Sequence, residues 1–399
     1  MTYDFTSVID RHGRDALAVE ALGQPGFPAA PQDGFDAIPM WVADMNFPTA
    51  PAIVEALQRR AAHPLYGYFQ APERYYDAII GWHQARHGVT GLEKKHIGHE
   101  NGVLGGLMSA LDAVCGADKR VLLHSPTYIG FTSTLTNGGY EIVHSPLQRD
   151  SEGVWRMDYA DMESQFRAGV RTLVLCSPHN PTGRVWERGE LEAVAALCEK
   201  YDVAVISDEI WSDIVLEGKH IPTQSIGGMR QRTVALYAPS KTFNLAGLVG
   251  SYRIIYNKRL RDQVEKESAR SRYNHMNVLS MHALIGAYCE EGRVWVDELC
   301  QVLSENVRYA CDYIAARFPG VKVSRPQGTY MLFLDCTEWC AAHGKTLPEL
   351  RDAGWNVGVI WQDGRPFHGE CHLRVNLALP LSRVQEAMER LDKYVFNPK

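Results

Sequence analysis

Four residues that could do chemistry follow apolar, strand-like runs in the central part of the chain. They are Tyr128 in "HSPTYIGF", Asn180 in "SPHNPTG", Asp208 in "ISDEIW" and Lys241 in "APSKTFNLAGL". Prolines and a glycine around Asn180 stop strand pairing and turn the chain sharply. Ligands of open α/β sheets bind at the carboxyl ends of the strands. We therefore expect the four side chains to lie along one edge of a sheet.

These residue types are the ones that pyridoxal phosphate requires. Its aldehyde needs a lysine for a Schiff base, which suits Lys241, and its pyridine nitrogen needs an acidic partner, which suits Asp208. Tyr128 can stack on the ring, and Asn180 can hydrogen-bond to the phenolic oxygen. An aspartate and a lysine at neighbouring strand ends can also form a plain ion pair, so the surrounding sequence has to decide between the two interpretations.

The stretch "HENGVLGGLMSALDAV" predicts an anion site. Gly102, Val103 and Leu104 would open a helix after a short strand, and the free N–H groups and dipole of a helix start favour a phosphate. This glycine pattern matches neither the P-loop nor the dinucleotide fingerprint. It therefore supports a phosphate site only together with the strand-end residues.

The elements that must position these residues form a parallel α/β pattern. Apolar strands alternate with amphipathic helical stretches from about residue 95 to 255, which is typical of a parallel sheet with crossover helices. After about residue 290 come a long helical stretch and a strand pair, which predict a smaller α+β domain. We expect an N-terminal arm over residues 1–45, a large domain over 46–288 and a small domain over 289–399.

Composition narrows the function classes. The formal net charge is −6 and the pI is near 6.2, which gives no general attraction to nucleic acid or acidic membranes. No secretory signal pattern and no run of about 18 apolar residues occurs, so we expect a cytoplasmic protein that is not membrane-bound. The odd number of cysteines, nine, predicts reduced thiols. Cys336, Cys340 and His343 have helical spacing but lack a fourth zinc ligand, so we predict no metal site.

The combination of motifs resembles a known family. "SPHNPTG", "SDEIW" and "SK" followed by "FNLAGL" resemble fold-type I pyridoxal phosphate enzymes, the aspartate aminotransferase superfamily. "PMWVADMNFPTAP", "HPLYGYF" and "SDEIWSDIVLEGKHIP" resemble the cystathionine β-lyase branch of the MalY/PatB type. The resemblance spans nearly the whole chain. It implies a large domain with a mostly parallel, seven-stranded sheet flanked by helices, a small α+β C-terminal domain that packs with the N-terminal arm, and pyridoxal 5'-phosphate as cofactor.

The resemblance also implies roles for individual residues. Lys241 would bind the cofactor and then remove the α-proton of the substrate, with Asn180 near both cofactor and substrate. Arg374 in "HLRVNLALP" would bind the substrate α-carboxylate through a bidentate guanidinium, although an arginine on an edge strand is otherwise more often solvated. Ser240 would contact the phosphate. Tyr68 in "LYGYF" would reach the phosphate region of the other subunit, which implies a homodimer with shared sites; its alternative role is aromatic packing.

Four positions depart from the family pattern. Trp211 stands where relatives often have Tyr or His, and we keep it as a cofactor-binding candidate although an indole N–H can only donate. Ala238 and Val249 stand where many members have a phosphate-binding Ser and Arg, which leaves the helix start, Ser240 and Tyr68 to bind the phosphate. Asn46 replaces a usual Asp.

The predicted reaction is a β-elimination on an amino acid with a sulfur leaving group. Cystathionine or another S-substituted cysteine would give a thiol, pyruvate and ammonia. An aminotransferase shares the early steps and stays the main alternative. A third possibility is an additional regulatory partner, because some relatives in this branch restrain a transcription activator.

Overall fold

The structure, a computed structural model, describes residues 1–398 as two compact units. The large unit contains residues 49–179 and 184–297, and the small unit contains residues 1–48, 180–183 and 298–399, of which residue 399 is not described.

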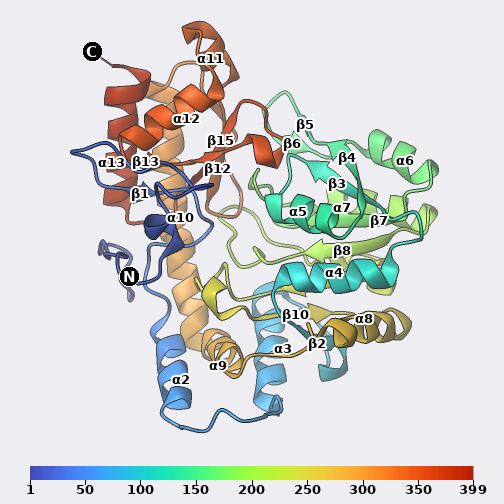
Figure 1. The fold of residues 1–399 in the computed structure, drawn as a ribbon. Helices are drawn as coiled ribbons and strands as arrows, with labels where there is room; N and C mark the ends of the chain where they lie inside the picture. The colour runs from blue at the N-terminus through green and yellow to red at the C-terminus, as the bar shows by residue number, and fades with distance from the viewer. Residues whose placement is uncertain (399) are drawn as a thin grey trace. The chain divides into compact units, whose positions relative to one another are not determined.

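A seven-stranded sheet forms the centre of the large unit (Figure 1). From one edge to the other its strands are β2 (Ile97–Glu100), β10 (Ser251–Ile254), β9 (Thr233–Tyr237), β8 (Ala204–Asp208), β7 (Thr172–Cys176), β3 (Arg120–Ser125) and β4 (Glu141–Pro146). The pairs from β9 to β4 are all parallel. The central strands are almost continuous apolar runs because both faces of a parallel sheet are covered. The predicted α/β class with a mostly parallel sheet is confirmed.

Strand β10 differs from the alternating parallel pattern that the sequence suggested. It runs antiparallel to both β9 and β2. Between Tyr237 and Ser251 the chain forms only the short 3₁₀ helix η4 (Ala246–Leu248), whereas a parallel return needs a longer crossover, usually with an α-helix. The short link therefore sets the direction of β10.

Helices surround this sheet. They are α2 (Pro51–Ala61), α3 (Glu73–His87), α4 (Val103–Val114), α5 (Ile129–Asn137), α6 (Tyr159–Arg167), α7 (Arg188–Lys200), α8 (Lys258–Ser271) and α9 (Val278–Ala287). The unit also has the hairpin β5–β6 (Gln148–Arg149, Trp155–Arg156) and the 3₁₀ helices η1 (Lys94–His96), η2 (Thr223–Ser225) and η3 (Met229–Gln231). A buried core cluster joins α4 to the strands, with Leu107, Leu111, Leu123, Val174 and Leu236 among its members. This packing fixes the start of α4 against the sheet.

The small unit is built on a four-stranded antiparallel sheet. Its strands are, in order, β11 (Lys322–Val323), β12 (Met331–Asp335), β15 (His372–Asn376) and β14 (Gln362–Asp363). Its helices are α1 (Leu17–Glu20), the C-terminal part of α10 (Glu290–Arg317), α11 (Thr337–His343), α12 (Leu347–Asn356), α13 (Leu381–Leu391), the 3₁₀ helix η5 (Arg365–Phe367) and a π-helical turn over Asp392–Phe396.

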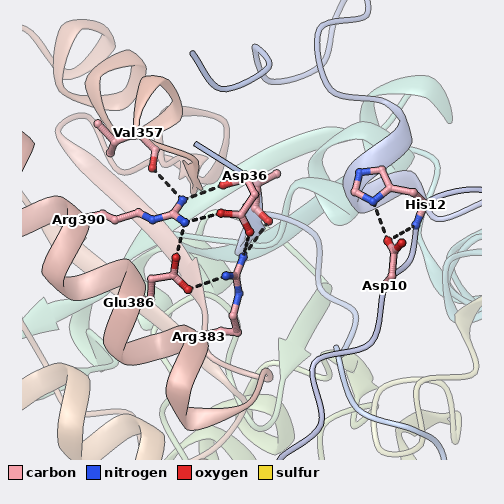
Figure 2. Close-up of polar contacts among 8 residues, drawn as sticks. Asp10, His12, Asp36, Val357, Arg383, Glu386 and Arg390 are labelled. Carbon is pink, nitrogen blue, oxygen red and sulfur yellow. Dashed lines mark hydrogen bonds and ion pairs between the residues drawn. The ribbon is translucent and has the colours of Figure 1, made fainter. Parts of the chain in front are cut away.

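The N-terminal arm is fastened to this unit by one strand pair and one charge network. Strand β1 (Ile38–Pro39) pairs in parallel with β13 (Val359–Ile360). Figure 2 shows Asp36 between Arg383 and Arg390 of α13, with the Arg383 Nη2–Asp36 Oδ2 distance at 2.5 Å. Glu386, three residues after Arg383 and four before Arg390, pairs with both. The arm therefore belongs to the small unit.

No helix within residues 1–398 combines the length and the apolar character that crossing a bilayer requires.

Candidate active site

Asp208 is the last residue of β8 and is buried, with 5% of its surface exposed. Its Oδ1 accepts a hydrogen bond from the N–H of Ile210 at 3.0 Å, the one hydrogen bond that its carboxylate makes among the described residues. Burial raises the pKa of Asp208 to about 7, although the Ile210 N–H and the positive charge of Lys241 act to lower it. The chain therefore leaves this carboxylate short of partners for its charged form.

Lys241 lies in the turn that follows β9, the strand next to β8. Two backbone bonds close this turn, from Phe243 N–H to Pro239 O at 2.9 Å and from Leu245 N–H to Ser240 O at 3.0 Å. Strand register places Asp208 opposite Leu236, so both strands end at the same edge of the sheet. The structure therefore brings Lys241 and Ser240 to the end of the sheet where Asp208 lies.

Trp211 is buried beside this lysine. The Nζ atom of Lys241 lies 5.9 Å from the centre of the Trp211 ring, within the range of a cation–π contact. The Trp211 ring thus contacts the lysine, and its side chain is 2% exposed. The substitution of Trp for the usual Tyr or His therefore supplies an apolar wall here.

The start of α4 has the form expected of an anion site. Gly102 is the N-cap residue with φ 87°, a conformation that favours glycine, and no side chain caps the helix. The first N–H groups of a helix have no partner within it. A Cβ atom built on Gly102 would lie 3.6 Å from Cγ1 of Val249, so Val249 is beside this helix start. Val249 thus contributes an apolar group where an arginine would contribute charge.

Tyr128 follows β3 and is the N-cap residue of α5. Its partly exposed ring packs edge-on against Phe131, with 5.4 Å between ring centres. A Cβ atom on Gly130 would lie 2.3 Å from the Tyr128 ring, so glycine at 130 is what allows this ring position. Local packing thus holds one edge of the ring and leaves part of the ring accessible.

Arg374 and Asn180 form a second group, in the small unit. Arg374 is 3% exposed on β15, which lies between β12 and β14. The alternative considered from the sequence, a solvated arginine on an edge strand, is therefore wrong, whereas the predicted role in binding the substrate carboxylate stays a prediction. Its guanidinium donates to Asn180 Oδ1 at 3.4 Å, to Trp41 O at 2.9 Å and to Gln362 Oε1, and it lies over the Phe367 ring at 4.5 Å. Gln362, which is paired with Arg374 across the sheet, was not predicted from the sequence.

Tyr68 lies in the loop between α2 and α3 and is fully exposed. Its neighbours Leu65, Tyr66 and Phe69 are also exposed, by 68%, 54% and 39%. Aromatic packing inside its own chain, the alternative considered from the sequence, does not occur among residues 1–398. This loop therefore presents an apolar surface around Tyr68.

Comparison with known proteins identifies the family. Residues 37–391 match the model of aminotransferase class I and II. The chain belongs to this family. It is similar to cystathionine beta-lyase PatB of Bacillus subtilis (34% identity over 362 residues, 89% of this chain and 92% of PatB) and to protein MalY of Escherichia coli (31% identity, 98% of both chains).

A solved structure agrees with this assignment. The pyridoxal-phosphate-bound C-S lyase of Staphylococcus hominis superposes with a TM-score of 0.88 at 28% identity, over 98% of each chain. The superfamily and the MalY/PatB branch that the motifs indicated are therefore confirmed.

The residues of this family member fit the cofactor of the family. Asp208 is a carboxylate whose pKa is raised by burial, and a protonated pyridine nitrogen would stabilise its charged form. The uncapped start of α4 offers N–H groups to a phosphate. In the small unit, the Asn180 Oδ1 atom accepts from Arg374, so the amide NH₂ is the group that Asn180 can donate to an oxygen.

Proposed function

We propose that the protein is a pyridoxal-phosphate-dependent carbon–sulfur lyase that eliminates a thiol from Cβ of cystathionine or another S-substituted cysteine. The observation that carries the proposal is that Asp208, buried at the end of β8, and Lys241, in the turn after β9, lie at the same end of the sheet. The choice of a lyase is supported by the similarity to PatB and to the C-S lyase of S. hominis. When bound, pyridoxal phosphate supplies an electron-withdrawing ring that makes the α-carbon of an amino acid acidic.

Asp208 and Lys241 have complementary roles in this proposal. The Asp208 carboxylate would keep a proton on the pyridine nitrogen, and that positive charge would stabilise the buried carboxylate. Lys241 would hold the cofactor aldehyde until the substrate amino group takes its place, and its freed Nζ would then accept the proton from the substrate α-carbon. The Nζ must be a neutral amine to accept that proton.

The remaining residues bind and orient. Arg374 holds the substrate α-carboxylate, and its contacts to Trp41 O, Gln362 and Phe367 fix the plane of the guanidinium. Asn180 donates to the phenolic oxygen, and Tyr128 covers the ring face. Gly102, Val103, Leu104 and Ser240 contact the phosphate.

The products follow from which bond breaks. After the α-proton has moved to Lys241, the Cβ–S bond breaks and the sulfur leaves with the bonding electrons, to be protonated as a thiol. The released aminoacrylate takes up water and yields pyruvate and ammonia. No second substrate accepts the amino group, whereas an aminotransferase requires a keto acid acceptor.

This difference gives the test. Purified holoenzyme incubated with cystathionine and no keto acid should release thiol and pyruvate in equal amounts over many turnovers. The Lys241→Ala variant, prepared in the same way, is the control for spontaneous thiol release. Pyruvate or thiol that appears only when a keto acid is added, in proportion to the amino group transferred, would contradict the lyase and support an aminotransferase.

We also propose a homodimer in which Tyr68 reaches the phosphate site of the other subunit. The exposed apolar loop around Tyr68 supports it, because a fully exposed tyrosine with exposed Leu65, Tyr66 and Phe69 beside it suits a protein interface. Two inactive variants, Tyr68→Ala and Lys241→Ala, should regain activity when mixed under conditions of subunit exchange, because one intact site then forms. Continued inactivity of the verified mixed dimer would contradict shared sites.

A cytoplasmic location completes the proposal. None of the nine cysteines forms a disulfide within the part of the chain that the structure describes, which agrees with a reducing compartment. Cell fractionation with an antibody to the protein tests it.

A further inference from the structure

A second buried carboxylate, Asp213, lies in the large unit five residues after Asp208 and is nearly inaccessible to solvent. Three residues of helix α3 lie against it. Trp82 Nε1 donates to Asp213 Oδ1 at 3.0 Å, His87 Nε2 lies 3.2 Å from the same oxygen, and Arg86 Nε lies 3.6 Å from it. This carboxylate is therefore held rigidly by one helix.

Its other oxygen contacts the lysine turn. Thr242, which follows Lys241 directly and is fully buried, donates from Oγ1 to Asp213 Oδ2 at 3.1 Å. Asp213 belongs to the segment that continues from Asp208 at the end of β8, and Thr242 belongs to the turn after β9. One hydrogen bond thus joins the two loops that carry Asp208 and Lys241.

The bond is of a strong type. Burial by itself would raise the pKa of Asp213, but His87 and Arg86 outweigh it and lower the pKa to about 2. These neighbours therefore favour the ionised form of Asp213. Hydrogen bonds to an ionised acceptor are shorter and stronger than those between neutral groups.

We propose that Asp213 is a positioning residue that acts through Thr242 to hold Lys241 at a fixed distance from Asp208. The inference rests on the proposed role of Lys241. Burial alone does not require this arrangement, because a valine would fill the site of Thr242 equally well. The hydroxyl is needed for the link to Asp213, and the link matters where Nζ must meet a reacting carbon, since a displacement of about 1 Å can cost about a hundredfold in rate.

The test replaces the hydroxyl of Thr242 and keeps its volume. Holoenzyme carrying Thr242→Val should show a kcat that is lower by roughly ten- to a hundredfold with a nearly unchanged KM, because substrate binding does not depend on the lysine position. The pH at which the visible absorption band of the bound cofactor titrates should also shift, because that band reports the surroundings of Lys241. Thr242→Ser, which retains the hydroxyl, should keep the wild-type values. Should the valine variant not fold, Thr242→Ala gives the same comparison.

Thr233 provides the matched control. It is fully buried on β9, and its hydroxyl has no hydrogen-bond partner among the described residues. Thr233→Val should leave kcat and the band titration unchanged. Wild-type values in Thr242→Val, or equal losses in Thr242→Val and Thr242→Ser, would overturn the positioning role, as would an unshifted band. A wild-type protein without any visible band would instead overturn the proposed function.

Discussion

Two adjacent carboxylates at the end of β8 have opposite electrostatic properties. Asp208 and Glu209 are both buried, with 5% and 0% of their surface exposed. Burial raises the pKa of Asp208 to about 7. Burial would also raise the pKa of Glu209, but hydrogen bonds outweigh it and the pKa is lowered. The donors to Glu209 are His220 Nε2 at 2.7 Å, Tyr237 OH at 2.7 Å, Ser207 Oγ at 3.0 Å and Thr223 N–H at 3.1 Å.

The difference shows that the fold distributes its hydrogen-bond donors unequally between the two carboxylates. A buried carboxylate is stable only when donors or opposite charges surround it. The chain supplies four such donors to Glu209, and one of them, Tyr237, links β9 to the end of β8. It supplies only the Ile210 N–H to Asp208 among the described residues. We infer that Glu209 stabilises the strand ends and that Asp208 is left for the cofactor. Variants of these carboxylates test this inference.

Replacing Asp208 should have the largest effect on activity. An opposite charge about 4 Å away is worth about 4 kcal/mol at an effective dielectric of 20. Since about 1.4 kcal/mol corresponds to a factor of ten, Asp208→Asn should lower kcat by at least about a hundredfold. Steady-state assays with cystathionine and saturating cofactor measure this. A loss of less than a few-fold would contradict the role of Asp208.

The same variant should be more stable than the wild type when both lack the cofactor. Because the pKa of Asp208 is raised in the folded protein, its protonation stabilises the fold. This stabilisation is fully present below the ordinary pKa near 3.8 and is lost as the pH rises through about 7. At pH 8, Asp208→Asn should therefore raise the free energy of unfolding by roughly 2–4 kcal/mol, a gain that disappears near pH 4. Urea unfolding of the cofactor-free proteins at both pH values gives the comparison. An unchanged or lower stability of the variant at pH 8 would show that Asp208 is satisfied within the chain.

Glu209→Gln should change stability in the opposite direction and lower the free energy of unfolding. The amide cannot accept all four hydrogen bonds, so at pH 7 the variant should lose about 1–3 kcal/mol of unfolding free energy. A carboxyl with a lowered pKa stabilises the fold above its ordinary pKa of 4.5, and this contribution is lost as the pH falls through the lower value in the folded protein. The difference between variant and wild type should therefore shrink in acid. The same urea series measures it, and a difference that grows in acid would contradict the assignment.

The difference between Asp208 and Glu209 can be predicted from the sequence only in part. Apolar runs followed by Asp208 and by Lys241 predict strand ends, and the chain forms them where expected. The letters "DE" do not reveal which carboxylate is satisfied, because the donors His220 and Tyr237 lie 11 and 28 residues away from Glu209. The direction of β10 and the interior position of Arg374 were likewise not predictable, since an apolar run encodes neither strand direction nor order in a sheet.

The smallest effect is expected at the surface of the small unit. Asp36 pairs with Arg383 and Arg390, but its side chain is 63% exposed, so water screens these pairs (Figure 2). Asp36→Asn should lower the free energy of unfolding by less than about 1 kcal/mol and leave kcat unchanged. A comparison of Asp36→Asn with Glu209→Gln shows whether burial determines how much a carboxylate contributes to the free energy of unfolding. A larger loss at Asp36 than at Glu209 would reverse that conclusion.

The central claim is that Lys241 holds the cofactor. Reduction of the yellow holoenzyme with borohydride fixes the cofactor to its lysine, and peptide mapping by mass spectrometry then locates it. The added mass should lie on the peptide that contains Lys241, and the Lys241→Ala variant should carry no added mass. Labelling of a different lysine, or a wild-type protein that remains colourless and unlabelled with added pyridoxal phosphate, would contradict it.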